Sequence, residues 1–187
     1  MKKAFYFDVE TTGLNPFKND IIQIAALVEI NGEIKGEFVS NVKPFDMENI
    51  HPKALETNGV TKSELIKYPE PNQVYKELIT FLAKYVNKFD KNDKFAPIGY
   101  NVKFDIDFLN NFFKKNQDKY YGSWFSWRYV DPLAILYHMD YRRKIALADY
   151  KLSTVCHHFG IPIEAHEALS DIRATRELLY ALDKIKL

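Results

Sequence analysis

The sequence lacks the features that would mark it as secreted or membrane-embedded. Its 187 residues contain one cysteine, Cys156, so no disulfide can form within the chain, and a lone thiol in an apolar helical pattern is typical of a core residue. No uncharged run is long enough to span a bilayer, and the N-terminal lysines are not followed by a small-residue cleavage site. These absences predict a cytoplasmic protein without a signal peptide or membrane segment.

An excess of charge of either sign is also missing. The 26 Lys and Arg residues nearly balance the 25 Asp and Glu residues, which leaves a formal net charge of +1. Overall charge therefore does not decide the function, and attraction for phosphates must come from local clusters or bound cations. Three basic stretches are available, 84–94, 114–119 and 142–144, although such stretches are more often solvated faces.

Hydrophobic and aromatic residues, by contrast, are abundant. They make up 47% and 15% of the chain, which is enough for one good core at this length. No internal repeat or low-complexity tract interrupts the sequence. We therefore predict a single domain over residues 1–187.

Short apolar runs predict the strands. The expected strands are Ala4–Glu10, Ile21–Ile30, Ile34–Val42, Lys94–Gly99 and Ser126–Val130. The second and third flank Asn31-Gly32, which is the strongest short-range signal for a β-hairpin. The first three strands are therefore expected to be antiparallel neighbours.

Apolar residues at helical spacing predict the helices. The expected helices are Lys53–Thr57, Lys62–Lys67, a helix from Asn72 through Phe89, a helix after Asn101, Pro132–Met139, Leu152–Phe159 and Ala168–Ile185. Asn101 is predicted as the N-cap of its helix. A strand hairpin followed by alternating helices and strands predicts an α/β architecture with helices packed on a central mixed sheet.

The first functional signal is a pair of carboxylates at the end of a buried strand. Because side chains alternate along a strand, Asp8 and Glu10 face one way, whereas Phe7 and Val9 face the opposite layer. Two carboxylates on one face of an apolar strand repel each other unless a cation or a proton lies between them. This favours a metal site, and the alternative is that both side chains simply emerge into solvent.

A second signal lies at the start of the helix that follows Asn101. Asp105 and Asp107 could serve only to complement the helix dipole, which is the simplest reading of either residue alone. Because they are two positions apart on a helix, they project to different sides. At most one of them is therefore expected to join Asp8 and Glu10.

The third signal is His166 followed by Asp171 at the head of the last helix. Five residues is a poor separation for two side chains to meet on one helix, so His166 is expected on the preceding loop. The intrinsic pKa of histidine suits a general base near neutrality. The other histidines are expected to be structural or exposed, namely His51, His138, His157 and His158.

Together these segments resemble the three exonuclease motifs of the DEDDh (DnaQ-like) family, which includes polymerase proofreading subunits and several ribonucleases. The motifs read Asp8-Val-Glu10-Thr-Thr-Gly13-Leu14, then Asn101-x-x-Phe-Asp105-x-x-Phe-Leu109, then His166 with Asp171. The resemblance spans nearly the whole chain and implies a ribonuclease-H-like fold, with a five-stranded mixed sheet flanked by helices. One departure is Tyr100, which precedes the second motif where many relatives carry histidine.

The resemblance implies a metal-dependent 3′→5′ exonuclease, a phosphodiester hydrolase that releases nucleoside monophosphates. By similarity, Asp8, Glu10, Asp105 and Asp171 would hold two Mg²⁺ or Mn²⁺ ions, and His166 would be the general base. The implied substrate-binding residues are Thr11, Thr12, Leu14 and Phe104, with Phe17 and Phe108 also available for stacking on bases.

Several alternatives stay open at this point. The substrate is expected to be the 3′ end of a single strand, with DNA favoured, but no motif encodes a contact that distinguishes DNA from RNA. A polymerase, another subunit or a second copy could be the protein partner, in DNA repair or proofreading, and the oligomeric state is undetermined. Competing functions are a binding module that has lost catalysis and an endonuclease, although a pure binder gains nothing from carboxylates crowded near phosphates.

Overall fold

The computed structural model describes residues 2–164 and 167–185. Its strands are β1 (Lys3–Thr11), β2 (Ile21–Ile30), β3 (Glu33–Asn41) and β4 (Ala96–Ile98). Its helices are α1 (Pro52–Asn58), α2 (Lys62–Leu65), α3 (Pro71–Ala83), α4 (Val102–Lys115), α5 (Tyr121–Trp124), α6 (Pro132–Tyr141), α7 (Leu152–Phe159) and α8 (Ala168–Leu182). None of these helices is long and apolar enough to cross a membrane.

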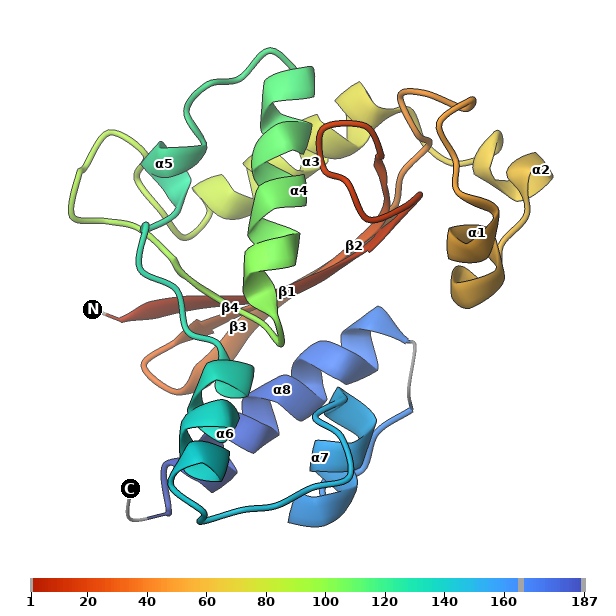
Figure 1. Cartoon of the computed structure of the whole chain (residues 1–187). Helices are drawn as coiled ribbons and strands as arrows, with labels where there is room; N and C mark the ends of the chain where they lie inside the picture. The colour runs from red at the N-terminus through yellow and green to blue at the C-terminus, as the bar shows by residue number, and fades with distance from the viewer. Residues whose placement is uncertain (1, 165–166, 186–187) are drawn as a thin grey trace.

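The strands form one mixed sheet in the order β3-β2-β1-β4 (Figure 1). β1 and β2 are antiparallel, as are β2 and β3, whereas β4 runs parallel to β1. Asn31 and Gly32 form the predicted hairpin turn, with φ angles of 55° and 86°. Positive φ at both central residues is what a two-residue turn with the right twist requires. The predicted α/β architecture is thus confirmed.

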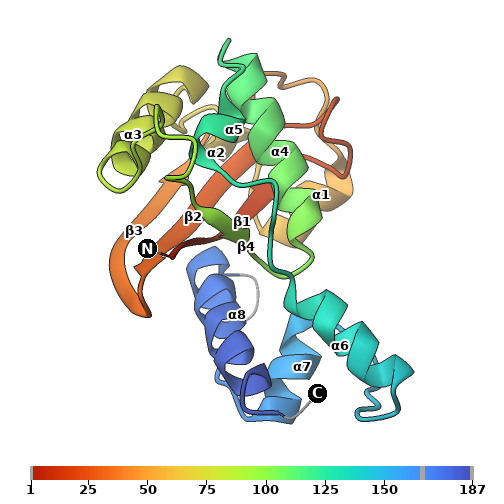
Figure 2. The same ribbon diagram turned by 90° about the vertical axis from the view of Figure 1, so that its left-hand side faces the viewer.

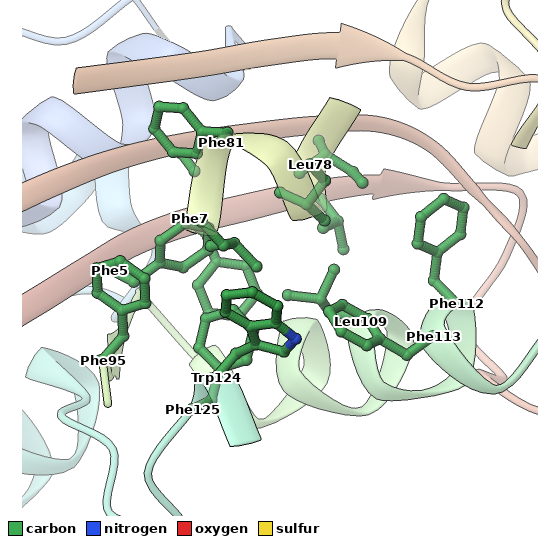
Figure 3. Packing of buried hydrophobic residues seen from close by; sticks show 14 of the residues in the cluster. Phe5, Phe7, Leu78, Phe81, Phe95, Leu109, Phe112, Phe113, Trp124 and Phe125 are labelled. Carbon is green, nitrogen blue, oxygen red and sulfur yellow. The ribbon is translucent and has the colours of Figure 1, made fainter. Parts of the chain in front are cut away.

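Helices cover both faces of this sheet (Figure 1). α3, α4 and α5 lie on one face, where Phe5 and Phe7 of β1 enter the main core (Figure 3). Val9 belongs to the same core. α8 lies on the other face, against Tyr6 of β1, and α6 and α7 pack in turn on α8. The alternation of β1 side chains therefore sends its apolar residues toward α4 and the intervening positions toward α8.

The predicted fifth strand, Ser126–Val130, is wrong among the described residues. Only two isolated parallel bridges form there, from Phe95 to Phe125 and from Ile98 to Val130. Between the two bridges the chain advances three residues from Phe95 to Ile98 but five residues from Phe125 to Val130. The longer segment must therefore bulge outward. Pro97 also lies between the bridges and has no N–H with which to continue a ladder.

Three helix predictions also need correction. The helix predicted from Asn72 ends at Ala83, and Phe89 lies beyond it with 86% of its surface exposed. The last helix ends at Leu182 rather than Ile185. Asn101 occupies the N-cap position of α4, but its φ of 59° is left-handed and its side chain caps nothing.

Asp131 performs the capping that was predicted for Asn101. Its carboxylate accepts hydrogen bonds from the N–H groups of Asn101 at 3.1 Å and Val102 at 3.2 Å, and it also caps α6 through Leu133 N–H at 3.0 Å. A single side chain therefore holds the first turns of two helices together. Satisfying backbone donors at a helix start is a known source of stability.

Gly99 brings the start of α4 close to β1. A Cβ at this position would lie 2.9 Å from the carbonyl oxygen of Phe7 and 2.9 Å from Cγ2 of Val102. The carbonyl belongs to the central strand and has little freedom to move. Only glycine therefore permits this approach, which places the first turn of α4 beside β1.

We predict that Asp131→Ala lowers the free energy of unfolding by about 2 kcal/mol, because three backbone donors lose a charged acceptor. Urea unfolding would measure the change. Asp107→Ala is the matched control, because its half-exposed carboxylate pairs with Lys103 on the surface of α4, and it should cost less than about 0.5 kcal/mol. Equal losses in the two variants would contradict the role given to Asp131.

Candidate active site

The candidate site forms at the carboxyl end of β1. Asp8 and Glu10 face the α8 side of the sheet and are half-buried, opposite Ala25 and Gln23 of β2. Phe7 and Val9 are buried on the α4 side, as alternation predicts. The two carboxylates therefore lie on the same face of β1 at its end, and the buried side chains of Phe7 and Val9 fix the strand from the opposite face.

Asp105 joins them from the first turn of α4. It is only 3% exposed, and its Oδ1 accepts a hydrogen bond from Val9 N–H at 3.1 Å. β4 pairs with β1 only from Ala4 to Tyr6, so the edge of β1 is open at Val9. The carboxylate takes the place that a neighbouring strand would otherwise fill. Asp107 points elsewhere and forms an ion pair with Lys103.

Asp171 arrives from the opposite layer, in the first turn of α8. Burial and the negative charges of Glu10 and Asp171 raise the pKa of Asp8 to about 8. Both side chains must therefore lie close enough to Asp8 to act on its charge. The structure thus brings together Asp8 and Glu10 from the sheet with an acid from each of the two flanking helices.

Burial is also the main cause of a raised pKa at Asp105. The charge of Asp8 adds to it, and the hydrogen bond from Val9 N–H partly opposes it. Mutual repulsion among buried carboxylates is the signature of a site that needs positive charge to be fully ionised. Among the described residues, however, no three Asp, Glu, His or Cys side chains are arranged to ligate a single ion.

His166 lies outside the described residues, so its predicted position on the loop before α8 stays a prediction. The four other histidines are exposed, as expected. His51 also caps α1, because its Nδ1 accepts from Lys53 N–H at 3.3 Å. Tyr100, whose role the motif left uncertain, donates its hydroxyl to the carbonyl of Tyr150 at 2.5 Å and packs against the α6–α8 cluster.

The loop after β1 is fixed by hydrogen bonds around Thr12. Its N–H donates to the carbonyl of Asp20 at 2.8 Å, its carbonyl accepts from His51 N–H at 2.8 Å, and its hydroxyl accepts from Asp20 N–H at 2.9 Å. Thr11 is likewise buried, and its carbonyl accepts from the amide of Asn58 at 3.0 Å. Both threonines therefore have internal bonds that support the loop.

The tip of this loop presents two large apolar side chains to solvent. Leu14 is 85% exposed and Phe17 is 79% exposed. A rigid base holds them, since Asn111 of α4 donates to the carbonyl of Pro16 and Lys115 pairs with the buried carboxylate of Asp20. Exposed apolar side chains next to a candidate site are typical of a binding surface.

The predicted stacking residues divide between core and surface. Phe108 is buried in the main core, at 2% exposure, which leaves no face for a base. Phe104 is half-buried and its ring centroid lies 4.8 Å from that of Phe108. Of the apolar residues predicted to meet a base, Leu14, Phe17 and Phe104 therefore remain accessible.

A mixed sheet whose first strand carries two carboxylates, met by acids from helices on both faces, is the arrangement that the three motifs predicted. The RNase_T family model, described as exonuclease, matches residues 5–179. The chain therefore belongs to this family of exonucleases, and it is a nuclease that hydrolyses phosphodiester bonds. The resemblance inferred from the three motifs is confirmed.

Individual similar proteins agree with the family. The chain is 30% identical over 182 residues to the PolC-type DNA polymerase III of Halalkalibacterium halodurans, covering 95% of this chain and 11% of that protein. E. coli Exonuclease I in complex with a dT13 oligonucleotide shares the fold, with a TM-score of 0.81, 23% identity, and coverage of 98% of this chain and 41% of that one. A zinc-bound E. coli ExoI–ssDNA complex matches with the same TM-score of 0.81 and 23% identity, and covers 98% of this chain and 40% of that one.

The raised pKa of Asp8 predicts how stability varies with pH in metal-free protein. The pKa is about 8 in the folded chain against 3.8 ordinarily, so between these values the folded state holds a proton that the unfolded state releases. This proton's contribution to the free energy of unfolding is fully present below about pH 4 and is lost as pH rises through 8. Asp8→Asn should remove the part of this loss that comes from Asp8, while the part from Asp105 remains, and should raise stability at pH 8 by on the order of 2 kcal/mol.

Urea unfolding at pH 5 and pH 8 in the presence of EDTA tests this expectation. Asp107→Asn, which removes an exposed carboxylate from the same helix as Asp105, should leave the pH dependence of the wild type unchanged. If Asp8→Asn kept the wild-type loss of stability between the two pH values, the electrostatic account of the site would be wrong.

Proposed function

We propose that this domain is a 3′→5′ exonuclease that uses divalent cations to release nucleoside monophosphates from single-stranded DNA. The observation that carries the proposal is the convergence of Asp8, Glu10, Asp105 and Asp171. Such a pocket repels phosphates by itself, and it becomes compatible with a polyanionic substrate only when cations neutralise it.

The chemistry of the donor set fits a hard divalent cation. All four side chains offer carboxylate oxygens, which favour Mg²⁺ and Mn²⁺. Asp8 would serve both of two ions, Glu10 and Asp171 the first, and Asp105 the second. Because no three of the described side chains are arranged around a single ion, these carboxylates would have to turn toward the ions as they bind. Bound cations of this kind supply an activated water and stabilise the leaving oxygen. A similar solved complex is described as zinc-bound, so Zn²⁺ belongs among the ions tested.

The remaining roles fall to protein groups around the acids. His166 would take the proton of the attacking water, a role that its ordinary pKa suits. Leu14 would lie against the base of the terminal nucleotide, supported by Thr11 and Thr12, and Phe104 would stack nearby. Hydrogen bonds within the loop hold this platform before substrate arrives, which limits the entropy lost on binding.

A small cleft beside Glu10 supports this placement of the terminal nucleotide. It has a volume of about 160 Å³, and its lining includes the amides of Gln23, Asn41 and Asn58. Amides both donate and accept hydrogen bonds, so they suit a nucleoside better than an apolar ligand. Glu10 lines the cleft, so the scissile phosphate would lie between the cleft and the other acids.

The comparisons favour DNA and a polymerase context. The two reported structures are complexes of E. coli Exonuclease I with single-stranded DNA, and the similar sequence belongs to a DNA polymerase. We therefore propose that the domain removes 3′-terminal nucleotides in proofreading or repair, in association with a polymerase or another subunit. A 3′-labelled single strand incubated with Mn²⁺ tests the activity, with RNA of the same sequence and a 3′-blocked DNA alongside. Labelled mononucleotide supports the proposal, whereas internal cuts or an intact strand contradict it.

We predict that Asp171→Ala abolishes mononucleotide release, with a loss of at least about 10³-fold, because it removes a ligand that no neighbour can replace. Asp8→Ala should behave in the same way. Both variants should unfold at or slightly above the wild-type urea midpoint without metal, because repulsion is relieved. Asp107→Ala is the control and should retain activity. Full turnover in either active-site variant would refute the assigned role.

His166→Ala should separate proton transfer from metal binding. We expect turnover to fall about 10²- to 10⁴-fold, which is the usual contribution of a general base, while Mn²⁺ affinity measured by calorimetry is unchanged. His157→Ala, at an exposed position on α7, serves as the histidine control. A loss of Mn²⁺ binding in His166→Ala would identify the residue as a ligand instead.

A further inference from the structure

A second groove lies at the opposite end of β1 from the acids. Its volume is about 1110 Å³, and it is lined by the beginnings of β1 and β4, by the segment 126–130 and by the end of α8. Figure 2 shows the start of β1, β4 and α8 lying side by side on the near side of the molecule. Nothing in the proposed reaction uses this groove.

An apolar wall separates the groove from the candidate active site. Tyr6 and Ile98 on the sheet pack against Ala168 and Ile172 of α8 between the two ends. Lys3, in the groove, and Asp8 are five residues apart on one strand, which corresponds to roughly 17 Å. A nucleic-acid strand that stayed stacked, with a rise of about 3.4 Å per nucleotide, would need about five further nucleotides to reach from the active site to the groove.

Basic side chains outnumber acidic ones in the lining of the groove. Five basic residues face two acidic ones there, namely Lys2, Lys3, Lys91, Lys94 and Arg128 against Glu29 and Asp183. Lys3 is paired with Asp93, and Glu29 is paired with Arg176. Within residues 2–164 and 167–185, Lys2, Lys91 and Arg128 form no salt bridge. The groove thus concentrates positive charge on a chain that is nearly neutral overall.

An exposed tryptophan stands beside these cations. Trp127 has 83% of its surface exposed, and the guanidinium of Arg128 lies 5.1 Å from its ring centroid. Both side chains belong to the bulge that is pinned at Phe125 and Val130 by isolated bridges. The backbone therefore presents the pair at a fixed place, although burying an indole of this size would otherwise be favourable.

We propose that this groove binds single-stranded nucleic acid upstream of the 3′ end. Lys2, Lys91 and Arg128 would contact phosphates, and Trp127 would stack on a base. A basic groove combined with an aromatic platform is how proteins hold single strands without sequence preference, since every base has a π-face. An acidic protein segment would use the cations but would not need an exposed indole next to them. The inference rests on the proposed nucleic-acid substrate and extends it to a second contact.

The double variant Trp127→Ala/Arg128→Ser tests the groove. Lys119→Ser/Tyr120→Ala is the matched control, because it removes an adjacent basic and aromatic pair that is also exposed but lies outside the groove. Fluorescence anisotropy in EDTA would measure the binding of 5′-labelled oligodeoxythymidylates of 15 and 3 nucleotides. Hydrolysis of both lengths with Mn²⁺ and the urea midpoint would be measured in parallel.

We expect the groove variant to bind the 15-nucleotide strand about tenfold more weakly, because a stack and a phosphate contact are lost. The slope of log K against log salt should become less negative by about 0.7. Hydrolysis of the 3-nucleotide strand and the urea midpoint should match the wild type, and the control variant should match it in every measurement.

Three results would overturn the inference. One is unchanged binding of the long strand, and another is an equal loss of hydrolysis for both lengths, which would place the effect at the active site. The third is equally effective displacement of the long strand by polyglutamate of the same charge, which would indicate an acidic protein partner. If wild-type protein hydrolyses neither length, the proposed function fails, but binding of the long strand in EDTA still decides whether the groove holds nucleic acid.

Discussion

The hydrogen bond from Val9 N–H to Asp105 is the contact on which the site depends. β4 ends before it reaches Val9, so the central strand has an unpaired donor at its carboxyl end. An open edge inside a protein is costly unless something satisfies it. Asp105 satisfies it with a carboxylate, and in doing so it brings a third negative charge to Asp8 and Glu10. The closure of the sheet edge and the assembly of the acidic pocket are therefore the same event.

This arrangement also explains why the acids are so far apart in sequence. A strand between two helical layers can receive a side chain from each layer, and the first turns of α4 and α8 both point to the end of β1. Helix N-termini stabilise carboxylates, which offsets part of the repulsion among them. Burial and the remaining repulsion together raise the pKa of Asp8, and a divalent cation would stabilise its charged form.

How far the sequence predicted the fold depended on how local each signal was. The Asn31-Gly32 hairpin and α7 were predicted correctly, because turn residues and helical spacing act over a few positions. The fifth strand failed because its pairing depends on Pro97, some thirty residues earlier. The prediction of Asn101 as the cap of α4 failed for a similar reason. The left-handed conformation of Asn101 is fixed by its contact with Asp131, thirty residues later, which the local sequence around Asn101 does not reveal.

The site followed the same rule. The alternation of side chains alone placed Asp8 and Glu10 on one face of the strand. Only the motif resemblance selected Asp105 over Asp107 and grouped Asp8, Glu10 and Asp105 with Asp171. Burial was the property that sequence could not supply. It decided that Phe108 is core while Leu14 and Phe17 stay accessible, and that Thr11 and Thr12 support the loop through internal bonds.

The near-zero net charge conceals a separation of charge along β1. Acids gather at its carboxyl end, whereas among the charged residues that line the groove beside its amino end, lysine and arginine outnumber aspartate and glutamate. A polyanion approaching this surface is repelled at one end and attracted at the other. In the proposed enzyme, the basic groove would therefore hold the nucleic acid upstream of its 3′ end. The 3′ end itself would enter the acidic pocket only together with cations. The amino end of β1 would thus determine the affinity for nucleic acid, and its carboxyl end would carry out the hydrolysis.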